Sequence, residues 1–308
     1  MTAASVEFRT ASELLALCAR DGSSIAELTL RREARERGEA RDLLLDRMSQ
    51  HLRVMRESVA SGLGIEAPSP SGLSGGDARK LLAYAAGPRP MLGAGLAKTL
   101  AYGCAVLECN AQFGRIVATP TAGSSGIVPA CLLRLQEESG LDDSRLTMAL
   151  FTAAGIGVVI GTNACFSGAQ GGCQAEVGSA SAMAAAAIVE AQGGSPTQAC
   201  DAAAFALMNA LGLVCDPVGG YVEIPCVHRN GLFAVHSFQA AILALAGVPC
   251  RIPLDDVILA LRDIGRRLPR ELKETSLGGL AITPAARGLR CRKGTPSPGL
   301  TGPRDSGG

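Results

Sequence analysis

The chain has 308 residues and a net charge of +1, from 29 basic and 28 acidic residues. This balance gives no electrostatic case for binding nucleic acid or an anionic membrane surface. Apolar residues make up 47% of the chain and aromatic residues only 3%, so a sizeable core must be built from small and aliphatic side chains. Small side chains let helices approach closely, which favours a mainly α protein.

The N-terminal part, about residues 1–90, has the pattern of short capped helices. Thr10 with Glu13, and Ser24 with Glu27, fit the capping box, in which each side chain satisfies a free backbone amide of the other residue. From residue 41 to 63, apolar side chains recur at helical spacing. Residues rich in Pro, Ser and Gly predict loops at 68–76 and 87–90.

The remaining part, about residues 91–290, reads as a packed multi-helix catalytic domain with Gly-rich loops. Ser195, followed by Pro196, is a strong helix start. Few stretches alternate as strands do, and from about residue 287 the composition turns basic and then Gly/Pro-rich, which predicts a disordered tail over 291–308. The predicted helices cover residues 93–110, 127–136, 146–162, 176–192, 196–213, 230–246 and 255–267. The predicted loops cover residues 119–126, 163–173 and 215–226.

One stretch resembles a membrane span, because no charged residue lies between Arg145 and Glu176. Its second half carries Thr162, Asn163 and Ser167 close together, which a lipid-facing helix rarely does. We therefore predict a helix buried on all sides that runs into a polar loop, with no membrane-spanning role.

The eleven cysteines need an explanation. The first residues lead into an amphipathic helix and not into an apolar signal segment, and the odd count in so long a chain argues against a disulfide framework. We expect a reducing, cytoplasmic compartment, in which most cysteines are small buried residues and a subset can bind metal.

Three cysteines stand out by their neighbours. Cys173, Cys215 and Cys226 each lie in a loop beside Gly or Pro and next to a helix end. Such loops free backbone amides that can hydrogen-bond to thiolates and cluster sulfides. Their separations of 42 and 11 residues match no short cluster motif, so on spacing alone buried reduced cysteines are the favoured interpretation. A zinc site is a further alternative, although paired Cys-x₂-Cys spacing is absent.

The loop over residues 119–126 is rich in Gly, Ser and Thr and precedes a predicted helix. Free amides and hydroxyls at a helix start suit an anion such as a substrate carboxylate, although such a loop is often a plain turn. No Gly-Lys-Ser/Thr follows, so it is not a Walker loop. The candidate substrate-binding residues of this loop are Thr121, Gly123, Ser124, Ser125 and Gly126.

Other candidates depend on position alone. Asn163 and Ser167 can line the site beside Cys173. His228 can orient a substrate, and Lys273 can pair with its carboxylate, although a structural His and a solvated Lys are the plainer interpretations. The four lysines lie in no convincing cofactor loop, so a pyridoxal phosphate enzyme is not expected.

Four long motifs resemble the α chain of the bacterial iron–sulfur L-serine dehydratases, a likeness that covers most of the chain. The motifs are GRIVATPTAGSSG at 114–126, SGAQGGCQAEVGS at 167–179, LGLVCDPVGG at 211–220 and ETSLGGL at 274–280. The resemblance implies a [4Fe–4S] cluster on Cys173, Cys215 and Cys226. It also implies conversion of L-serine to pyruvate and ammonia by β-elimination, in which the open iron acts as a Lewis acid.

In this family a β chain or an added domain completes the enzyme. This sequence begins with the helical part, so we expect a separate β chain in a heterodimer or heterotetramer. No residue stands out as the general base, which the partner can supply. Cys291, beyond the usual family end, can cap the fourth iron or be a free cysteine. The same cluster can also act on L-threonine or L-cysteine. From another class, a helical scaffold or a zinc-binding partner module without catalysis remains an alternative.

Overall fold

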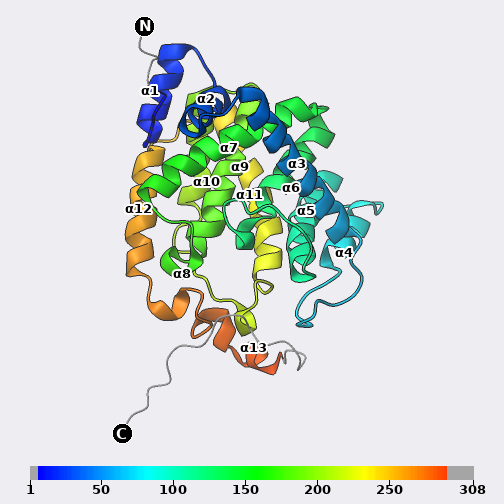
Figure 1. The fold of residues 1–308 in the computed structure, drawn as a ribbon. Coiled ribbons are helices and arrows are strands. Elements are labelled where there is room, and N and C mark those ends of the chain that lie inside the picture. Colours follow the sequence, from blue (N-terminus) through cyan, green and yellow to red (C-terminus); the bar gives the residue numbers. More distant parts are fainter. Residues whose placement is uncertain (1–5, 290–308) are drawn as a thin grey trace.

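The computed structural model describes residues 6–289, so the predicted tail and Cys291 lie outside the described residues. Over the described range the chain forms α-helices and no strand, with one isolated parallel bridge between Cys215 and Lys273. The mainly α prediction is confirmed. Helices α1 and α2 lie at one end of the molecule, and the segment after α12 lies at the other (Figure 1).

The N-terminal helices follow the predicted caps. Thr10 and Glu13 form the full capping box, and the Ser24 hydroxyl accepts from the Glu27 amide. A helix from Asp77 to Ala85, between the two predicted loops, was not expected. The first four helices are α1 (Ala11–Asp21), α2 (Ile25–Arg37), α3 (Arg41–Leu63) and α4 (Asp77–Ala85).

Carboxylates from distant helices cap three of these helix starts, which joins the N-terminal part to the core. Asp255 accepts from the Ala11 and Ser12 amides at the start of α1. Glu190 does the same at the start of α2, and Glu108 at the start of α4. A carboxylate suits this position because it meets unpaired amides at the positive end of the helix dipole.

The core helices agree with the predicted ones within a few residues, apart from four differences. Helix α11 begins at Cys226 and not near residue 230, and α10 ends at Met208 and not near 213. The short α8 lies in a predicted loop, and a π-turn over Gln174–Gly178 precedes α9. The core helices are α5 (Ala94–Ala111), α6 (Ile127–Ser139), α7 (Asp143–Asn163), α8 (Gly168–Gly171), α9 (Ser179–Ala191), α10 (Pro196–Met208), α11 (Cys226–Leu245), α12 (Leu254–Arg267) and α13 (Pro284–Gly288).

Helix α9 lies at the centre, against α6, α7, α10 and α11. Its sequence is mainly Ala, and almost every residue is buried. Helices α5 and α11 also approach closely, because a Cβ atom added at Gly103 would lie 2.7 Å from the backbone of Gly231. This crossing brings the start of α11, and with it Cys226, against the loop before α6.

Helix α7 is long and apolar enough to cross a membrane by length and composition, and 67% of that stretch is buried inside the protein. Its neighbours include α2, α3 and α9. A core helix of a folded domain has the same properties, as the sequence predicted for this stretch.

Candidate active site

Three buried thiols come together from separate elements. Cys173 directly precedes the π-turn, Cys215 forms the isolated bridge with Lys273, and Cys226 is the first residue of α11. Burial raises the pKa of Cys173 to about 11 and that of Cys226 to about 12. The pKa of Cys215 is raised by burial and then by the charges of Cys173, Glu176, Glu274 and Cys226.

Backbone hydrogen bonds fix two of these thiols relative to each other. The Gln174 amide donates to the Leu213 carbonyl over 2.9 Å, and the Gln174 side chain accepts from the Gly212 amide over 2.8 Å. These bonds hold the start of the π-turn against the segment that leads to Cys215. The Cys215 amide in turn donates to the Leu272 carbonyl over 2.9 Å.

Asn230, which is buried one turn after Cys226, joins the third thiol to the Gly/Ser/Thr loop. Its amide nitrogen donates to the carbonyls of Gly123, over 2.8 Å, and Cys226, over 2.9 Å. Its oxygen accepts from the Gly126 amide over 2.9 Å. One side chain therefore uses three hydrogen bonds to set the distance between the loop and α11.

Glu176 lies in the π-turn, half-buried, between the loop and the thiols. Its Oε1 accepts from the Thr121 hydroxyl over 2.8 Å, and its Oε2 lies 3.9 Å from Cys215 Sγ. Burial is the largest cause that raises the pKa of Glu176 to about 7, while the Thr121 hydrogen bond lowers it. The carboxyl group can therefore gain or lose a proton near neutral pH.

Arg229 brings the positive charge of the site. Its guanidinium donates to the Val214 carbonyl over 2.9 Å and to Asp216 over 3.0 Å. The Arg229 charge lowers the pKa values of Cys173 and Cys226 against the effect of burial. Arg229 therefore offsets part of the negative charge that three thiolates would bring to the site.

A second set of side chains fastens the two flanks of Cys226. The carboxylate of Glu223 accepts hydrogen bonds from the hydroxyls of Ser69, over 2.6 Å, Ser71, over 2.5 Å, and Ser74. On the other flank, His228 Nε2 lies 3.0 Å from a carboxylate oxygen of Asp77. We call the contacts of Glu223 with these three serines the serine clasp.

The loop over 119–126 differs in part from the expectation of free amides. The amides of Ser124 and Ser125 donate to carbonyls within the loop, and that of Gly126 donates to Asn230. The Ser125 hydroxyl donates to the Ala122 carbonyl over 2.8 Å. Among the described residues, the amides of Ala122 and Gly123 have no partner, so they are the loop amides that can meet a ligand.

The remaining predicted residues lie at different places. Ser167 precedes Gly168, where an added Cβ atom would lie 2.6 Å from a Glu176 oxygen and 3.0 Å from Cys215 Sγ, so Ser167 borders the site. The side-chain amide nitrogen of Asn163 donates to the carbonyls of Arg9 and Val159, so Asn163 joins the N-terminal segment to α7. His228 is exposed and paired with Asp77, and Lys273 contributes its backbone to the bridge with Cys215.

Sequence reasoning did not single out Glu176, Arg229 or Asp216. One signal was available, since Glu176 is the only charged residue between Arg145 and Glu190. An isolated charge within so apolar a stretch has to be paired or functional when it is enclosed by the fold.

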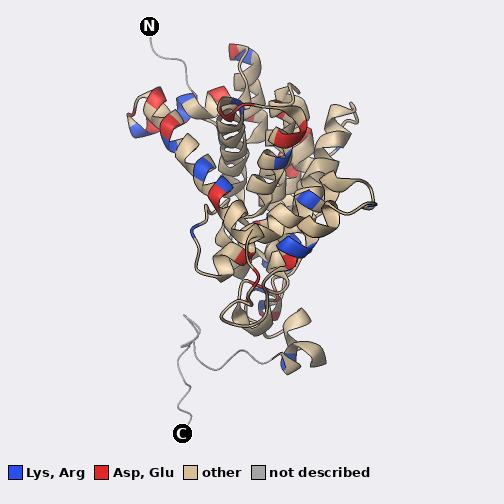
Figure 2. Ribbon diagram, turned by 90° about the vertical axis from the view of Figure 1, so that its right-hand side faces the viewer, with Lys and Arg blue, Asp and Glu red and all other residues tan. Residues whose placement is uncertain are grey.

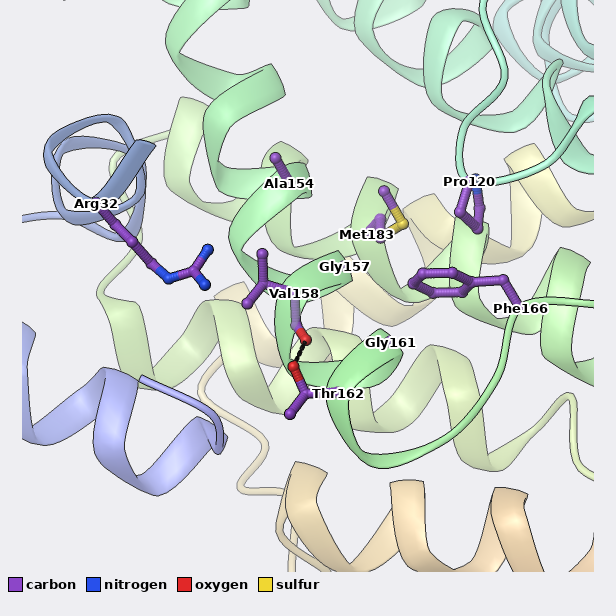
Figure 3. A pocket seen from close by; sticks show the side chains of 9 residues that line it. All are labelled: Arg32, Pro120, Ala154, Gly157, Val158, Gly161, Thr162, Phe166 and Met183. Carbon is purple, nitrogen blue, oxygen red and sulfur yellow. Dashed lines mark hydrogen bonds between the residues drawn. The ribbon is translucent and has the colours of Figure 1, made fainter. Parts of the chain in front are cut away.

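Neither of two prominent cavities is lined by the three thiols. A cavity of about 410 Å³ follows α7 between Arg32 at one end and Pro120, Phe166 and Met183 at the other (Figure 3). Pro120 directly precedes Thr121, so this cavity reaches the back of the loop. A second cavity of about 380 Å³ lies between α12 and the segment before Cys173.

Three thiols are a donor set that an iron–sulfur cluster can use, because each thiolate binds a different iron. Within residues 6–289, no group of three Cys, His, Asp or Glu side chains is arranged to hold a single metal ion. Glycine is required at residue 168, because an added Cβ atom would lie 2.6 Å from a Glu176 oxygen and 3.0 Å from Cys215 Sγ.

The fold and the site define a class of all-α protein, in which three thiols, a half-buried carboxyl group and a Gly/Ser/Thr loop form one polar centre. The chain matches the family described as serine dehydratase alpha chain over residues 20–281. It therefore belongs to the serine dehydratase alpha chain family.

Named relatives span the same range. The chain is 44% identical over 283 residues to a probable L-serine dehydratase, alpha chain, of Bacillus subtilis, covering 92% of this chain and 94% of the relative. It is 40% identical to the L-serine dehydratase, alpha chain, of Peptoniphilus asaccharolyticus, covering 91% and 96%. The L-serine dehydratase of Streptomyces coelicolor is 41% identical, but there the match spans only 61% of the relative and 89% of this chain.

Proposed function

We propose that this chain is the catalytic α chain of an L-serine dehydratase, a lyase that converts L-serine to pyruvate and ammonia. The observation that carries the proposal is the meeting of three buried thiols with Glu176 and the Gly/Ser/Thr loop. The names of the relatives support serine as the substrate. L-Threonine differs from L-serine by a methyl group on Cβ, and L-cysteine differs by a thiol as the leaving group. These two amino acids are therefore the alternative substrates to compare with L-serine.

Cys173, Cys215 and Cys226 would hold a [4Fe–4S] cluster, with no pyridoxal phosphate. When bound, a cluster with three protein thiolates supplies one open iron as a Lewis acid for the substrate hydroxyl. Arg229 would offset the charge of the thiolates, since it lies on the same helix as Cys226 and its charge lowers the pKa values of Cys173 and Cys226.

The chain's own residues would bind the substrate and handle a proton. The amides of Ala122 and Gly123 suit the substrate carboxylate, with Ser167 at the border of the same space. Glu176 can hold a proton at Oε2, because Thr121 occupies Oε1 and leaves the other oxygen directed at the Cys215 side of the site. It is therefore this chain's candidate for the general base or acid, ahead of His228 and Lys273.

A separate β chain would complete the enzyme in a cytoplasmic assembly, as a heterodimer or heterotetramer. The alpha chain names of the relatives support a partner, and the L-serine dehydratase of Streptomyces coelicolor has further sequence that this chain does not match. Assays of the reconstituted chain with and without a β chain test this requirement. Full activity of the pure chain alone would contradict it.

Anaerobic iron and sulfide analysis tests the cluster. The wild type is compared with Cys173→Ala, Cys215→Ala and Cys226→Ala, with Cys131→Ala as a matched control because Cys131 is buried in α6 away from the site. We expect iron, sulfide and absorption near 400 nm to be lost in the first three and kept in the control. Cluster retention in all three, or zinc in a colourless wild type, would refute the assignment.

A further inference from the structure

The segment from Leu272 to Leu280 crosses the site directly beside Cys215. The Cys215 amide donates to the Leu272 carbonyl over 2.9 Å, and the Glu274 amide donates to the Cys215 carbonyl over 2.7 Å. Two hydrogen bonds on either side of Lys273 therefore fix this segment to one of the three thiol-bearing residues. The backbone of residue 274 therefore keeps a constant position relative to Cys215.

The backbone here holds an uncommon conformation. Glu274 has φ of 62° and Ser276 has φ of 57°, in the left-handed region that side chains rarely adopt. The Ser276 hydroxyl donates to the Pro217 carbonyl over 2.7 Å, and the Leu280 amide donates to Asp216 over 2.8 Å. These bonds tie the segment to the residues that follow Cys215, so the conformation is imposed by the site.

The carboxylate of Glu274 is exposed and, among the residues that the structure describes, forms no ion pair. It nevertheless borders the site, because the Glu274 amide is hydrogen-bonded to the Cys215 carbonyl. The one cation in the site, Arg229, is already paired with Asp216. Within residues 6–289, the border of the site therefore holds a carboxylate whose charge no ion pair offsets.

We propose that Glu274 binds the α-ammonium group of the amino-acid substrate. An amino acid carries an anionic carboxylate and a cationic ammonium group, and the loop amides of Ala122 and Gly123 can serve only the first. Glu274 is an exposed carboxylate whose backbone is hydrogen-bonded to Cys215, and the charge of an ammonium group complements it. This assignment rests on the proposed function and adds the group that selects amino acids over hydroxy acids.

The neighbouring residues supply matched controls. Glu271 is exposed two residues before Lys273, and it carries the same charge outside the bridge with Cys215. Glu274→Gln removes only the charge. Glu274→Asn also removes it, with a residue that tolerates the left-handed region better, so a loss shared by both variants does not come from backbone strain.

The test measures apparent affinity for the anaerobically reconstituted full chain, with its β chain where one is required, as the KM for L-serine turnover and the inhibition constant of 3-hydroxypropionate. The probes are L-serine and 3-hydroxypropionate, which is serine without the amino group. We expect Glu274→Gln and Glu274→Asn to weaken L-serine binding roughly ten- to a hundredfold and to change 3-hydroxypropionate binding less than about twofold. Glu274→Asp should recover part of the loss, and Glu271→Gln should bind as the wild type does.

Two results would overturn the assignment. One is unchanged L-serine affinity in both neutral variants, and the other is an equal loss for both probes, which would mean that Glu274 merely shapes the site. If the wild type binds L-serine and the variants bind it equally well, only the role of Glu274 fails. If the loaded wild type binds no amino acid, the proposed function fails as well.

Discussion

Two carboxyl groups, Glu176 and Glu223, lie within a few residues of the thiols, and their surroundings differ. Glu223 is buried and accepts hydrogen bonds from three serine hydroxyls. Glu176 is half-buried and accepts one hydroxyl hydrogen bond, from Thr121, while its second oxygen lies near Cys215. The same side-chain type therefore serves two purposes within one site.

Glu223 and Glu176 differ in the number of hydroxyl groups that donate hydrogen bonds to the carboxyl group. Hydrogen bonds from three hydroxyls hold a carboxyl group in place, so the serine clasp gives Glu223 a structural role. Glu176 has too few donors to offset its burial, and its pKa rises to about 7. A carboxyl group with an open oxygen beside the substrate space is suited to chemistry, whereas a saturated one is suited to holding a loop.

Glu176→Gln should give the largest effect on activity. The amide keeps the shape and can still accept from Thr121, but it cannot take up a proton. We expect kcat to fall roughly 10²- to 10⁴-fold, the range for loss of a general acid or base. Iron and sulfide content and the thermal midpoint should stay close to those of the wild type.

Glu223→Gln serves as the matched control for that variant. If it lowers kcat per cluster as much as Glu176→Gln does, the two carboxyl groups do not differ in role. Retained kcat in Glu176→Gln would place the base elsewhere, on the partner chain.

Glu223→Gln should instead reduce stability. The substitution replaces charge-assisted hydrogen bonds by weaker ones and directs an amide donor at serine hydroxyls. We expect the free energy of unfolding to fall by about 2 kcal/mol, measured by urea denaturation of the apo chain. Loss of cluster from Glu223→Gln at unchanged stability would mean that the clasp positions Cys226 rather than supporting the fold.

Ser71→Ala removes one of the three hydroxyls that donate to Glu223. Its loss of stability can be compared with that of Glu223→Gln. The hydroxyl donates to Glu223 and accepts from the Leu73 amide, and the residue is buried. We expect a loss of about 1 kcal/mol in the free energy of unfolding, smaller than for Glu223→Gln because two serines remain. A loss as large as that of Glu223→Gln would show that the three hydroxyls act as one unit.

Local sequence signals predicted most of the fold. The capping residues Thr10 and Ser195 begin helices as expected, and the apolar repeat over 41–63 matches α3. Helix α11 begins earlier than predicted, because Pro225 and Cys226 were assigned to a Gly-rich loop, whereas proline is well suited to a helix start. The cysteine motifs directed attention to the correct loops but could not show that those loops meet.

The site depends on contacts between distant residues, which no local pattern reveals. Thr121 and Glu176 are 55 positions apart, and Ser69 and Glu223 are 154 apart. The pKa of Glu176 follows from burial and from Thr121, so its chemistry arises only when the chain has folded. The resemblance to a known family compensated in part, since it identified the thiols but not the carboxyl groups.

His228→Asn should have the smallest effect on stability and activity. It tests the side of Cys226 that lies opposite the serine clasp. The imidazole side chain is 53% exposed and pairs with Asp77 at the surface, where solvent screens the interaction. We expect a change of at most about 1 kcal/mol in the free energy of unfolding, with kcat and cluster content retained. Asp77→Asn removes the other partner and also the Asp77–Lys80 ion pair, so its loss of stability should be equal or larger. A large loss of kcat in His228→Asn, with kcat retained in Asp77→Asn, would give this histidine a catalytic role.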